Sequence, residues 1–325
     1  MPGDLVFLTG ATGFIGGHVA RALAVQGFRV RALVRRTDAR VPDAEIVHGD
    51  LENAGSLAES MRGCRYLVHC AALYSFAPRE RALLTRVNVE GTAALLEAAR
   101  IAGIERAVVT SSSSTVGPQR NGAAATEASY AVAEHGSAYH RSKLSQERAA
   151  IAARVPAVLV LPTAPVGPGD WKPTPTGRLV LDFARGRIPA RPDGGGLNLV
   201  AVEDVAQAHV DALRCGTPRE RYLIGGENLS FDELWELLSA VTGRPAPSFR
   251  LPHSVALAAG LVDELRCRVV PSARPLVPLE GVRMAREHMY VDWSKAKREL
   301  GYRASPVRDA LARAVEWYRG NGYLN

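Results

Sequence analysis

The sequence predicts an α/β protein in which a doubly wound parallel sheet is followed by a smaller, mostly helical region. Two observations support this fold class. Between residues 4 and 161, short runs rich in Val and Leu alternate with segments whose apolar residues recur at helical spacing. The runs are apolar throughout rather than at every second position, which is typical of strands that helices cover on both faces, as in parallel sheets.

The first region is expected to contain strands and helices in regular succession. Residues 4–9 form an apolar run that ends before a glycine, and Ile15, Val19 and Leu23 then recur at the spacing of a helix face. The same argument predicts, in chain order, strand 4–9, helix 14–26, strands 28–34 and 45–48, helix 54–62, strand 65–70, helix 85–102, strand 106–111, helix 137–153 and strand 157–161.

A second region is expected to begin after Pro162, where several prolines and the run Gly194-Gly195-Gly196 interrupt the alternation. The predicted division assigns residues 1–163 to the first domain, with 198–225 returning to it. Residues 164–197 and 226–325 then form the second region.

The second region is predicted to be mostly helical. Its segment 254–262 is apolar all round, which is typical of a buried helix, with contact to a membrane or a lipid-like substrate as the alternative. The elements expected after residue 200 are helices 202–213, 231–242, 254–266, 293–300 and 307–317 and strand 221–224.

The composition excludes a disordered or fibrous chain, because 47% of the 325 residues are apolar and 22% are charged. The net charge of +7 arises from 40 basic residues, of which only Lys143, Lys172, Lys295 and Lys297 are lysines. Apart from the pair Arg35-Arg36, the 36 arginines are scattered singly, and they form no basic run. We therefore interpret them as solvated surface charge and expect no nucleic-acid partner.

The cysteines and histidines favour a cytoplasmic protein without a metal. Cys64, Cys70, Cys215 and Cys267 make no C-x-x-C pair and have apolar neighbourhoods, which indicates buried free thiols in a reducing compartment. The eight histidines lack metal-binding spacing, so no metal site is expected. No cleavable leader and no run approaching about 18 apolar residues is present, so we expect a soluble chain without stable membrane insertion.

A glycine-rich loop joins the first strand to the first helix, which is the context that a dinucleotide-binding loop requires. Gly10 permits a tight turn, Gly13 lets backbone N–H groups approach a pyrophosphate at the positive helix end, and Gly16 lets helix and strand pack closely. The sequence therefore predicts a Rossmann-type domain. The expected cofactor contacts in this loop are Gly10, Thr12, Gly13, Phe14, Ile15 and Gly16.

The type of dinucleotide is read at the end of the second strand, about 20 residues further on. That position holds Arg35 and then Arg36, whose guanidinium groups match the 2′-phosphate of NADP(H). Asp38 is a competing residue that would bind the ribose hydroxyls of NAD(H) instead. NADP(H) is favoured, and NAD(H) stays open.

A tyrosine and a lysine lie at i and i+4 on the predicted helix 137–153 and therefore share one helix face. They are Tyr139 and Lys143. A free tyrosine titrates near pH 10. A cationic lysine beside it, with the positive ring of an oxidised nicotinamide, favours the tyrosinate and brings the phenol toward acid–base chemistry near neutral pH.

With the serine run Ser111 to Ser114 after the fifth strand, these motifs resemble the extended short-chain dehydrogenase/reductase family, also described as NAD-dependent epimerases and dehydratases. The resemblance covers almost the whole chain. Supporting motifs are Gly49-Asp50-Leu51, Ala71-Ala72, Asn88-Val89-Glu90-Gly91-Thr92 and Val202-Glu203-Asp204-Val205-Ala206. Residues 29–35 and 110–112 resemble dihydroflavonol reductase-like members, whereas residues 172–178, 225–229 and 281–286 resemble hopanoid-associated sugar epimerases.

The resemblance implies roles for individual residues. Ser112, five residues before Gly117, aligns with the catalytic serine that polarises the substrate carbonyl, and Ser113 is the alternative register. Asn88 would support the active-site architecture. The helices that carry Asn88 and Tyr139 would form the contact between the two subunits of a homodimer. Further cofactor contacts implied are Arg35 at the 2′-phosphate, Asp50 and Leu51 at the adenine, Lys143 at the nicotinamide ribose, and Arg36, Ala71, Ala72, Asn88, Tyr139, Pro162 and Thr163.

These motifs predict an NADP(H)-dependent oxidoreductase that interconverts a ketone or aldehyde and an alcohol through Ser112, Tyr139 and Lys143. The alternative is an NAD(P)-dependent nucleotide-sugar epimerase of the hopanoid-associated type, and a lesser alternative is a non-catalytic NADP-binding sensor. Ser113 and Ser114 stand where related dehydratases carry an Asp-Glu pair, which disfavours elimination. The expected partner is a small carbonyl, alcohol or sugar substrate.

Overall fold

Seven strands, all parallel to their neighbours, form the central sheet of the computed structural model, which describes residues 3–36, 41–52, 54–75, 77–119, 122–131, 137–270 and 279–324. The strand order is β3-β2-β1-β4-β5-β6-β10, so β2 and β3 extend the sheet on one side of β1 and the strands from β4 onward extend it on the other. In open parallel sheets, ligands bind beyond the carboxyl ends of the strands at such a switch point, which here lies between β1 and β4. The strands are β1 (Leu5–Thr9), β2 (Arg29–Val34), β3 (Ala44–His48), β4 (Tyr66–His69), β5 (Arg106–Thr110), β6 (Ala157–Pro162) and β10 (Arg221–Ile224).

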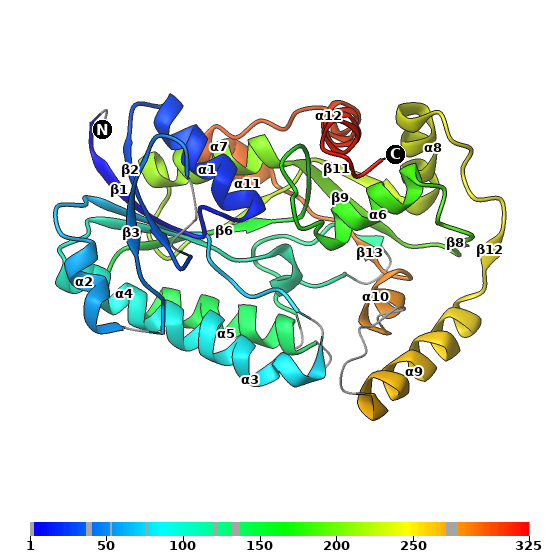
Figure 1. Ribbon diagram of the computed structural model, residues 1–325, viewed down its shortest axis with the longest axis horizontal. Coiled ribbons are helices and arrows are strands. Elements are labelled where there is room, and N and C mark those ends of the chain that lie inside the picture. The colour runs from blue at the N-terminus through cyan, green and yellow to red at the C-terminus, as the bar shows by residue number, and fades with distance from the viewer. Residues whose placement is uncertain are drawn as a thin grey trace.

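Helices cover both faces of this sheet, as the apolar strands require (Figure 1). The helices α1 (Phe14–Val25), α7 (Val202–Cys215) and α11 (Ser294–Leu300) lie on one face, and α1 packs directly against α7. The other face carries α2 (Ala54–Ser60), α4 (Gly91–Ile101) and α5 (Ala138–Ala152). The predicted doubly wound Rossmann-type α/β fold is therefore confirmed.

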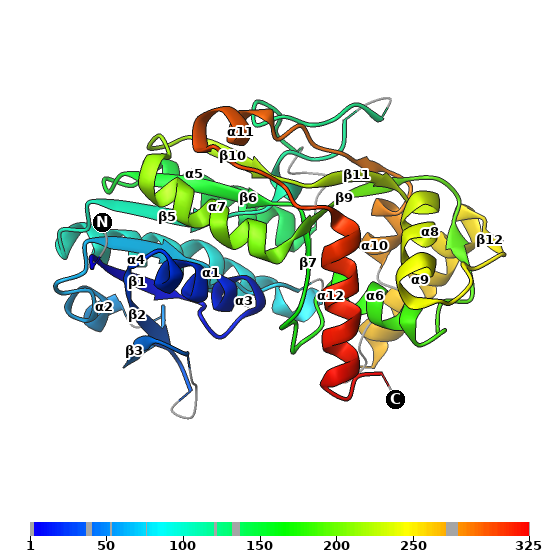
Figure 2. The ribbon, with the colours of Figure 1, turned by 90° about the horizontal axis from the view of Figure 1, so that it is seen from above.

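A smaller second sheet lies beside the first, and its strands come from residues 164–289 (Figure 2). Its central strand is β9 (Gly196–Ala201), which pairs with β7 (Ala164–Val166), β11 (Glu227–Ser230) and β13 (His288–Met289). The helices α6 (Pro175–Ala184), α8 (Phe231–Thr242) and α12 (Val307–Gly320) pack on it through a separate apolar core. The short strands β8 (Arg191–Pro192) and β12 (Arg250–Leu251) pair with one another, and α9 (His253–Val269) contacts α10 (Leu279–Met284).

The proline-rich segment after Pro162 is more regular than the sequence predicts, because it contains both α6 and β9. Pro175 occupies the first turn of α6, where its missing N–H costs no hydrogen bond, and the Thr174 side chain accepts from Gly177 N. The proline that suggested an interruption therefore begins a helix.

Helix α9 corrects the expectation that residues 254–262 form a buried helix. Val255, Leu261 and Val262 are 53%, 51% and 69% exposed. The physical reason is that α9 projects away from both sheets, with α10 as its neighbour (Figure 1). Within the described part of the chain, no helix has the length and apolar character needed to cross a bilayer.

The four cysteines are free thiols, but they do not share one environment. Cys64 is buried just before β4, whereas Cys215 is exposed at the last residue of α7. The expectation of buried neighbourhoods is therefore wrong for Cys215.

Candidate active site

The loop between β1 and α1 forms a glycine cradle, in which a side chain at Gly10 or Gly16 would collide with the backbone. Gly10 has a φ of +77°, and a Cβ there would lie 2.5 Å from the backbone nitrogen of Ala71, in the loop after β4. A Cβ on Gly16 would lie 2.1 Å from Gly10 O. Gly13 precedes the first turn of α1 without a capping side chain, so the first N–H groups of the helix stay available to an anion. These residues fit a dinucleotide pyrophosphate.

Two arginines follow β2 at its carboxyl end, beside this cradle. Arg35 and Arg36 are both exposed, directly after the buried Val34. The competing Asp38 lies outside the described residues. The structure thus keeps two cations at the place where a dinucleotide's ribose is read in this topology.

The other predicted cofactor residues lie at the carboxyl ends of neighbouring strands. Asp50 and the buried Leu51 follow β3, and Ala71 donates its N–H to Thr9 Oγ1 after β4. Pro162 ends β6, and the hydroxyl of Thr163 donates to Asn198 Oδ1 at 2.8 Å. The parallel sheet therefore brings these separate motifs to one edge, with Ala72 next to Ala71.

Ser112, Tyr139 and Lys143 come together at the same edge. Ser112 follows β5, and its Oγ accepts from Ser114 N at 3.2 Å. The Ser112 hydroxyl lies near enough to the Tyr139 phenol to lower the pKa of that group. Ser113 lies in the short turn that the contact between Ser112 and Ser114 caps. Tyr139 packs against Tyr74 with ring centroids 4.5 Å apart, so an aromatic wall borders the phenol.

Lys143 is 1% exposed, and two acceptors hold its ammonium group. Nζ donates to Thr110 O at 2.8 Å and to Gln146 Oε1 at 2.6 Å. Burial lowers the pKa of Lys143 to about 8, against the attraction of the Glu147 carboxylate, which raises it. One of the three ammonium protons is left for a further acceptor.

The phenol does not have the environment that the sequence suggests. Burial raises the pKa of Tyr139 to about 12, and the Ser112 hydroxyl lowers it only in part. Lys143 directs its ammonium at Thr110 and Gln146 rather than at Tyr139. The protein's own groups therefore favour the protonated phenol at neutral pH. The expected tyrosinate also depends on the positive ring of an oxidised nicotinamide and stays a prediction.

Asn88 occupies a π-helical segment, η2 (Thr85–Glu90), inside the helical stretch predicted over 85–102. Its side chain is fully buried. Nδ2 donates to Leu73 O at 2.9 Å and to Ser142 Oγ at 3.0 Å, and Oδ1 accepts from Leu73 N. Asn88 thus ties the loop after β4 to the helix that carries Tyr139, and such π segments are frequent at functional sites.

A buried polar chain runs from Lys143 to the glycine cradle. Gln146 Nε2 donates to Thr92 Oγ1, which itself donates to Asn88 O. The Thr92 oxygen therefore accepts from His69 Nε2, while His69 Nδ1 accepts from Thr9 Oγ1 at 2.7 Å. Burial lowers the pKa of His69 to about 3, so the ring stays neutral. The chain fixes the lysine relative to β1 and β4.

Sequence reasoning missed the residues of this chain and a buried pair beside it. His69 and Arg221 carried a signal, because each is a polar residue in an otherwise apolar strand. Gln146 and Glu147 lie one turn after Lys143 on the predicted helix, and that spacing could have marked them. Among the described residues, no group of histidine, cysteine and carboxylate side chains could hold a metal ion.

A Rossmann sheet with a glycine cradle and a buried lysine beside a tyrosine defines an NAD(P)-dependent enzyme. Residues 6–225 match the model of the NAD dependent epimerase/dehydratase family. The chain belongs to this family, within the extended short-chain dehydrogenases/reductases.

Its relatives include reductases. The chain is 41% identical, over 99% of its length and 96% of the relative, to "Putative dihydroflavonol 4-reductase" of Synechocystis sp.. It is 35% identical to "Sterol demethylase protein B" of Methylococcus capsulatus, over 98% of this chain and 99% of the relative. The crystal structure of gox2253 superimposes with a TM-score of 0.87 at 37% identity, covering 99% of this chain and 100% of the other.

Proposed function

We propose that the protein is an NADP(H)-dependent oxidoreductase that interconverts a ketone or aldehyde with the corresponding alcohol. The observation that carries the proposal is that Ser112, Tyr139 and a buried Lys143 come together at the carboxyl edge of the sheet, with the phenol protonated. A carbonyl oxygen placed between the two hydroxyls would be polarised by both.

In the reductive direction the carbonyl carbon gains a hydride and the oxygen gains a proton. The nicotinamide, when bound, supplies the hydride. Tyr139 donates its phenolic proton to the oxygen, and Ser112 donates a hydrogen bond that stabilises the developing negative charge. Lys143 stabilises the resulting tyrosinate by its positive charge, and its remaining N–H would help to hold the nicotinamide ribose. Oxidation of the alcohol reverses each step.

The NADP(H) preference is assigned to Arg35 and Arg36 after β2. Replacing Arg35 with alanine is expected to weaken NADPH binding about 10- to 100-fold, because a charge-assisted contact with the 2′-phosphate is lost. NADH binding should change little. The measurement is fluorescence titration of both nucleotides, with Arg29→Ala at the opposite end of β2 as the control. Unchanged NADPH affinity in Arg35→Ala would contradict the assignment.

The pH dependence follows from the buried lysine. Because the pKa of Lys143 is lowered to about 8, the ammonium is charged below pH 8 and loses its charge as the pH rises through that value. We expect kcat/KM for carbonyl reduction to fall along an alkaline limb centred near pH 8. Lys143→Arg, whose guanidinium stays charged, should show no limb there in the activity it retains. A limb at the same pH in both proteins would show that another group titrates.

Epimerisation of a nucleotide sugar is the second candidate, because family members share the opening hydride transfer and the chain resembles sugar epimerases at residues 172–178, 225–229 and 281–286. Net consumption of NADPH with a ketone supports the reductase. Inversion of a sugar without net consumption would instead establish the epimerase. Elimination is disfavoured, since Ser113 and Ser114 lack acid–base groups for it.

The substrate is proposed to be a ring-bearing carbonyl compound, because the two relatives bear the names of a dihydroflavonol reductase and a sterol demethylase component. Residues 164–197 and 226–325 are proposed to shape its pocket, with Tyr74 as an aromatic wall beside Tyr139. Profiling the purified protein with NADPH against cyclic ketones and UDP-sugars tests this class. Turnover of UDP-sugars alone would overturn it.

A further inference from the structure

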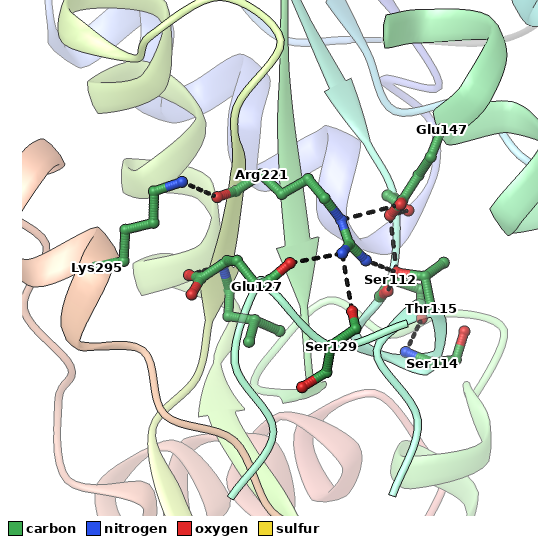
Figure 3. A network of polar contacts seen from close by, with 10 residues as sticks. Ser112, Ser114, Thr115, Glu127, Ser129, Glu147, Arg221 and Lys295 are labelled. Carbon is green, nitrogen blue, oxygen red and sulfur yellow. Dashed lines mark hydrogen bonds and ion pairs between the residues drawn. The ribbon is translucent and has the colours of Figure 1, made fainter. Parts of the chain in front are cut away.

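A buried ion pair lies beneath the candidate active site and has no role in the chemistry described so far (Figure 3). Arg221 Nε lies 3.1 Å from Glu147 Oε2, and the two side chains are 5% and 2% exposed. Arg221 begins β10, and Glu147 lies on α5 one turn after Lys143. Burying two charges costs several kcal/mol per ion unless hydrogen bonds satisfy both groups. Their remaining partners therefore indicate what the pair does.

The partners of Glu147 flank the candidate catalytic serine. Its Oε1 accepts from Ser111 Oγ at 2.5 Å and from Thr115 Oγ1 at 2.8 Å. The Thr115 hydroxyl also lies 2.8 Å from Ser112 O. One carboxylate oxygen thus fixes both sides of the turn on which Ser112 stands.

The Arg221 fork fixes the same turn from the opposite side. Nη2 donates to Thr115 Oγ1 at 3.0 Å, and Nη1 donates to Glu127 O at 2.7 Å and Ser129 O at 3.0 Å. The guanidinium carbon lies 4.1 Å from the centre of the Tyr130 ring. Figure 3 shows the fork pointing between the Ser112 turn and the segment 127–129.

The strand end that carries this fork is itself held in place. Lys295 of α11 donates to Arg221 O at 3.0 Å, and Glu127 Oε1 accepts from Leu223 N at 2.9 Å. The pair therefore joins β10, the Ser112 turn and α5 through side chains with defined partners. An apolar core residue at either position would fill the space without fixing the register of the turn.

We propose that Arg221 and Glu147 are positioning residues, which hold the Ser112 turn against the face of α5 that carries Tyr139 and Lys143. The role in catalysis rests on the proposed function, because Ser112 has its assigned task only in that reaction. The electrostatic effect of Glu147 on Lys143 does not depend on that reaction.

The pKa of Lys143 reports on the charges of the Arg221–Glu147 pair and can be measured without substrate. The ionisable groups that influence or adjoin it are Glu147, Cys70, His69 and Tyr139, and of these the Glu147 carboxylate raises the pKa of Lys143 most. Removing Glu147 leaves Arg221 as an uncompensated cation, whereas removing Arg221 leaves the carboxylate uncompensated. The two single variants should therefore move the lysine in opposite directions.

The pKa of Lys143 can be measured by NMR of the protein with side-chain-labelled lysine, because the chain has only four lysines and gives four signals. The signal that is missing in Lys143→Arg belongs to Lys143. Glu147→Gln is expected to lower the pKa of Lys143, and Arg221→Gln, which leaves the carboxylate uncompensated, is expected to raise it. The double variant, with neither buried charge, should return close to the unmodified protein. If both single variants leave the titration unchanged, or move it in the same direction, the inference is wrong.

Kinetic measurements then test whether the Arg221–Glu147 pair affects catalysis through Ser112. Arg221→Gln should lower kcat about 10- to 100-fold with a small change in KM, since a displaced catalytic group loses transition-state contacts. In a Ser112→Ala background the same change should cost little more. An undiminished loss there would show a general structural role and overturn the proposal. Absence of any NADPH-dependent turnover in the unmodified protein contradicts the proposed function instead, and the lysine titration then decides the inference.

Discussion

Replacing Tyr139 with phenylalanine is expected to reduce kcat for carbonyl reduction by about two to four orders of magnitude. The substitution removes the O–H that lies within hydrogen-bond reach of Ser112 and would deliver the proton to the substrate oxygen. Because burial holds the phenol protonated at neutral pH, its loss removes a proton donor that is already in its active form. Steady-state kinetics with NADPH and a ketone substrate measure the effect.

Tyr74 provides a matched control for this change, since its ring lies 4.5 Å from that of Tyr139. Tyr74→Phe makes the same chemical change in the same part of the site, and we expect a much smaller loss of kcat. NADPH affinity should be retained in Tyr139→Phe, because the glycine cradle is unaltered. Equal losses in the two variants would show that the phenol of Tyr139 has no particular part in proton transfer.

The sequence was sufficient to predict the parts of the site whose residues lie close together along the chain. The spacing of Tyr139 and Lys143 follows from one helix, and the glycine loop follows from one strand–helix junction. Parallel topology then places the motifs after β3, β4, β5 and β6 at one edge without further information. These inferences needed only local periodicity and the rule that parallel strands share their carboxyl ends.

The electrostatics of the site could not be predicted in the same way. The Glu147 carboxylate meets Arg221 from β10, a strand whose partner in the sheet is β6, and only tertiary packing brings the two together. The balance of effects on Tyr139 could not be predicted for the same reason, because burial raises the pKa of the phenol and Lys143 Nζ is directed at Thr110 and Gln146. Spacing on a helix gives proximity, whereas charge stabilisation depends on what else is buried there.

The proline-rich segment shows a different limit. Thr174 caps α6 and Pro175 fills its first turn, so residues that usually indicate a loop begin a helix. Gly177 is needed within that helix because a Cβ would lie 2.1 Å from Asp170 Oδ2. Each of these residues has a position-specific role that composition alone does not distinguish from an irregular segment.

Replacing Gly16 with alanine is expected to abolish tight NADP(H) binding and to destabilise the fold. A Cβ at this position would lie 2.1 Å from Gly10 O and 2.6 Å from Gly10 C, and both are backbone atoms that no side-chain rotation can move. The start of α1 must then shift away from the cradle, and the N–H groups aimed at the pyrophosphate shift with it. We expect the free energy of unfolding to fall by about 1–3 kcal/mol, as in other overpacked sites.

The adjacent glycine separates this steric effect from the general effect of adding a methyl group to α1. A Cβ on Gly17 would meet Ala11 O at 3.4 Å, which is an ordinary contact, so Gly17→Ala is expected to stabilise the helix by about 0.5–1 kcal/mol. Urea unfolding and nucleotide titration of both variants should give changes of opposite sign in stability and a loss of binding in Gly16→Ala alone. Similar nucleotide affinity in the two variants would mean that the close approach of α1 to the loop is not what creates the binding site.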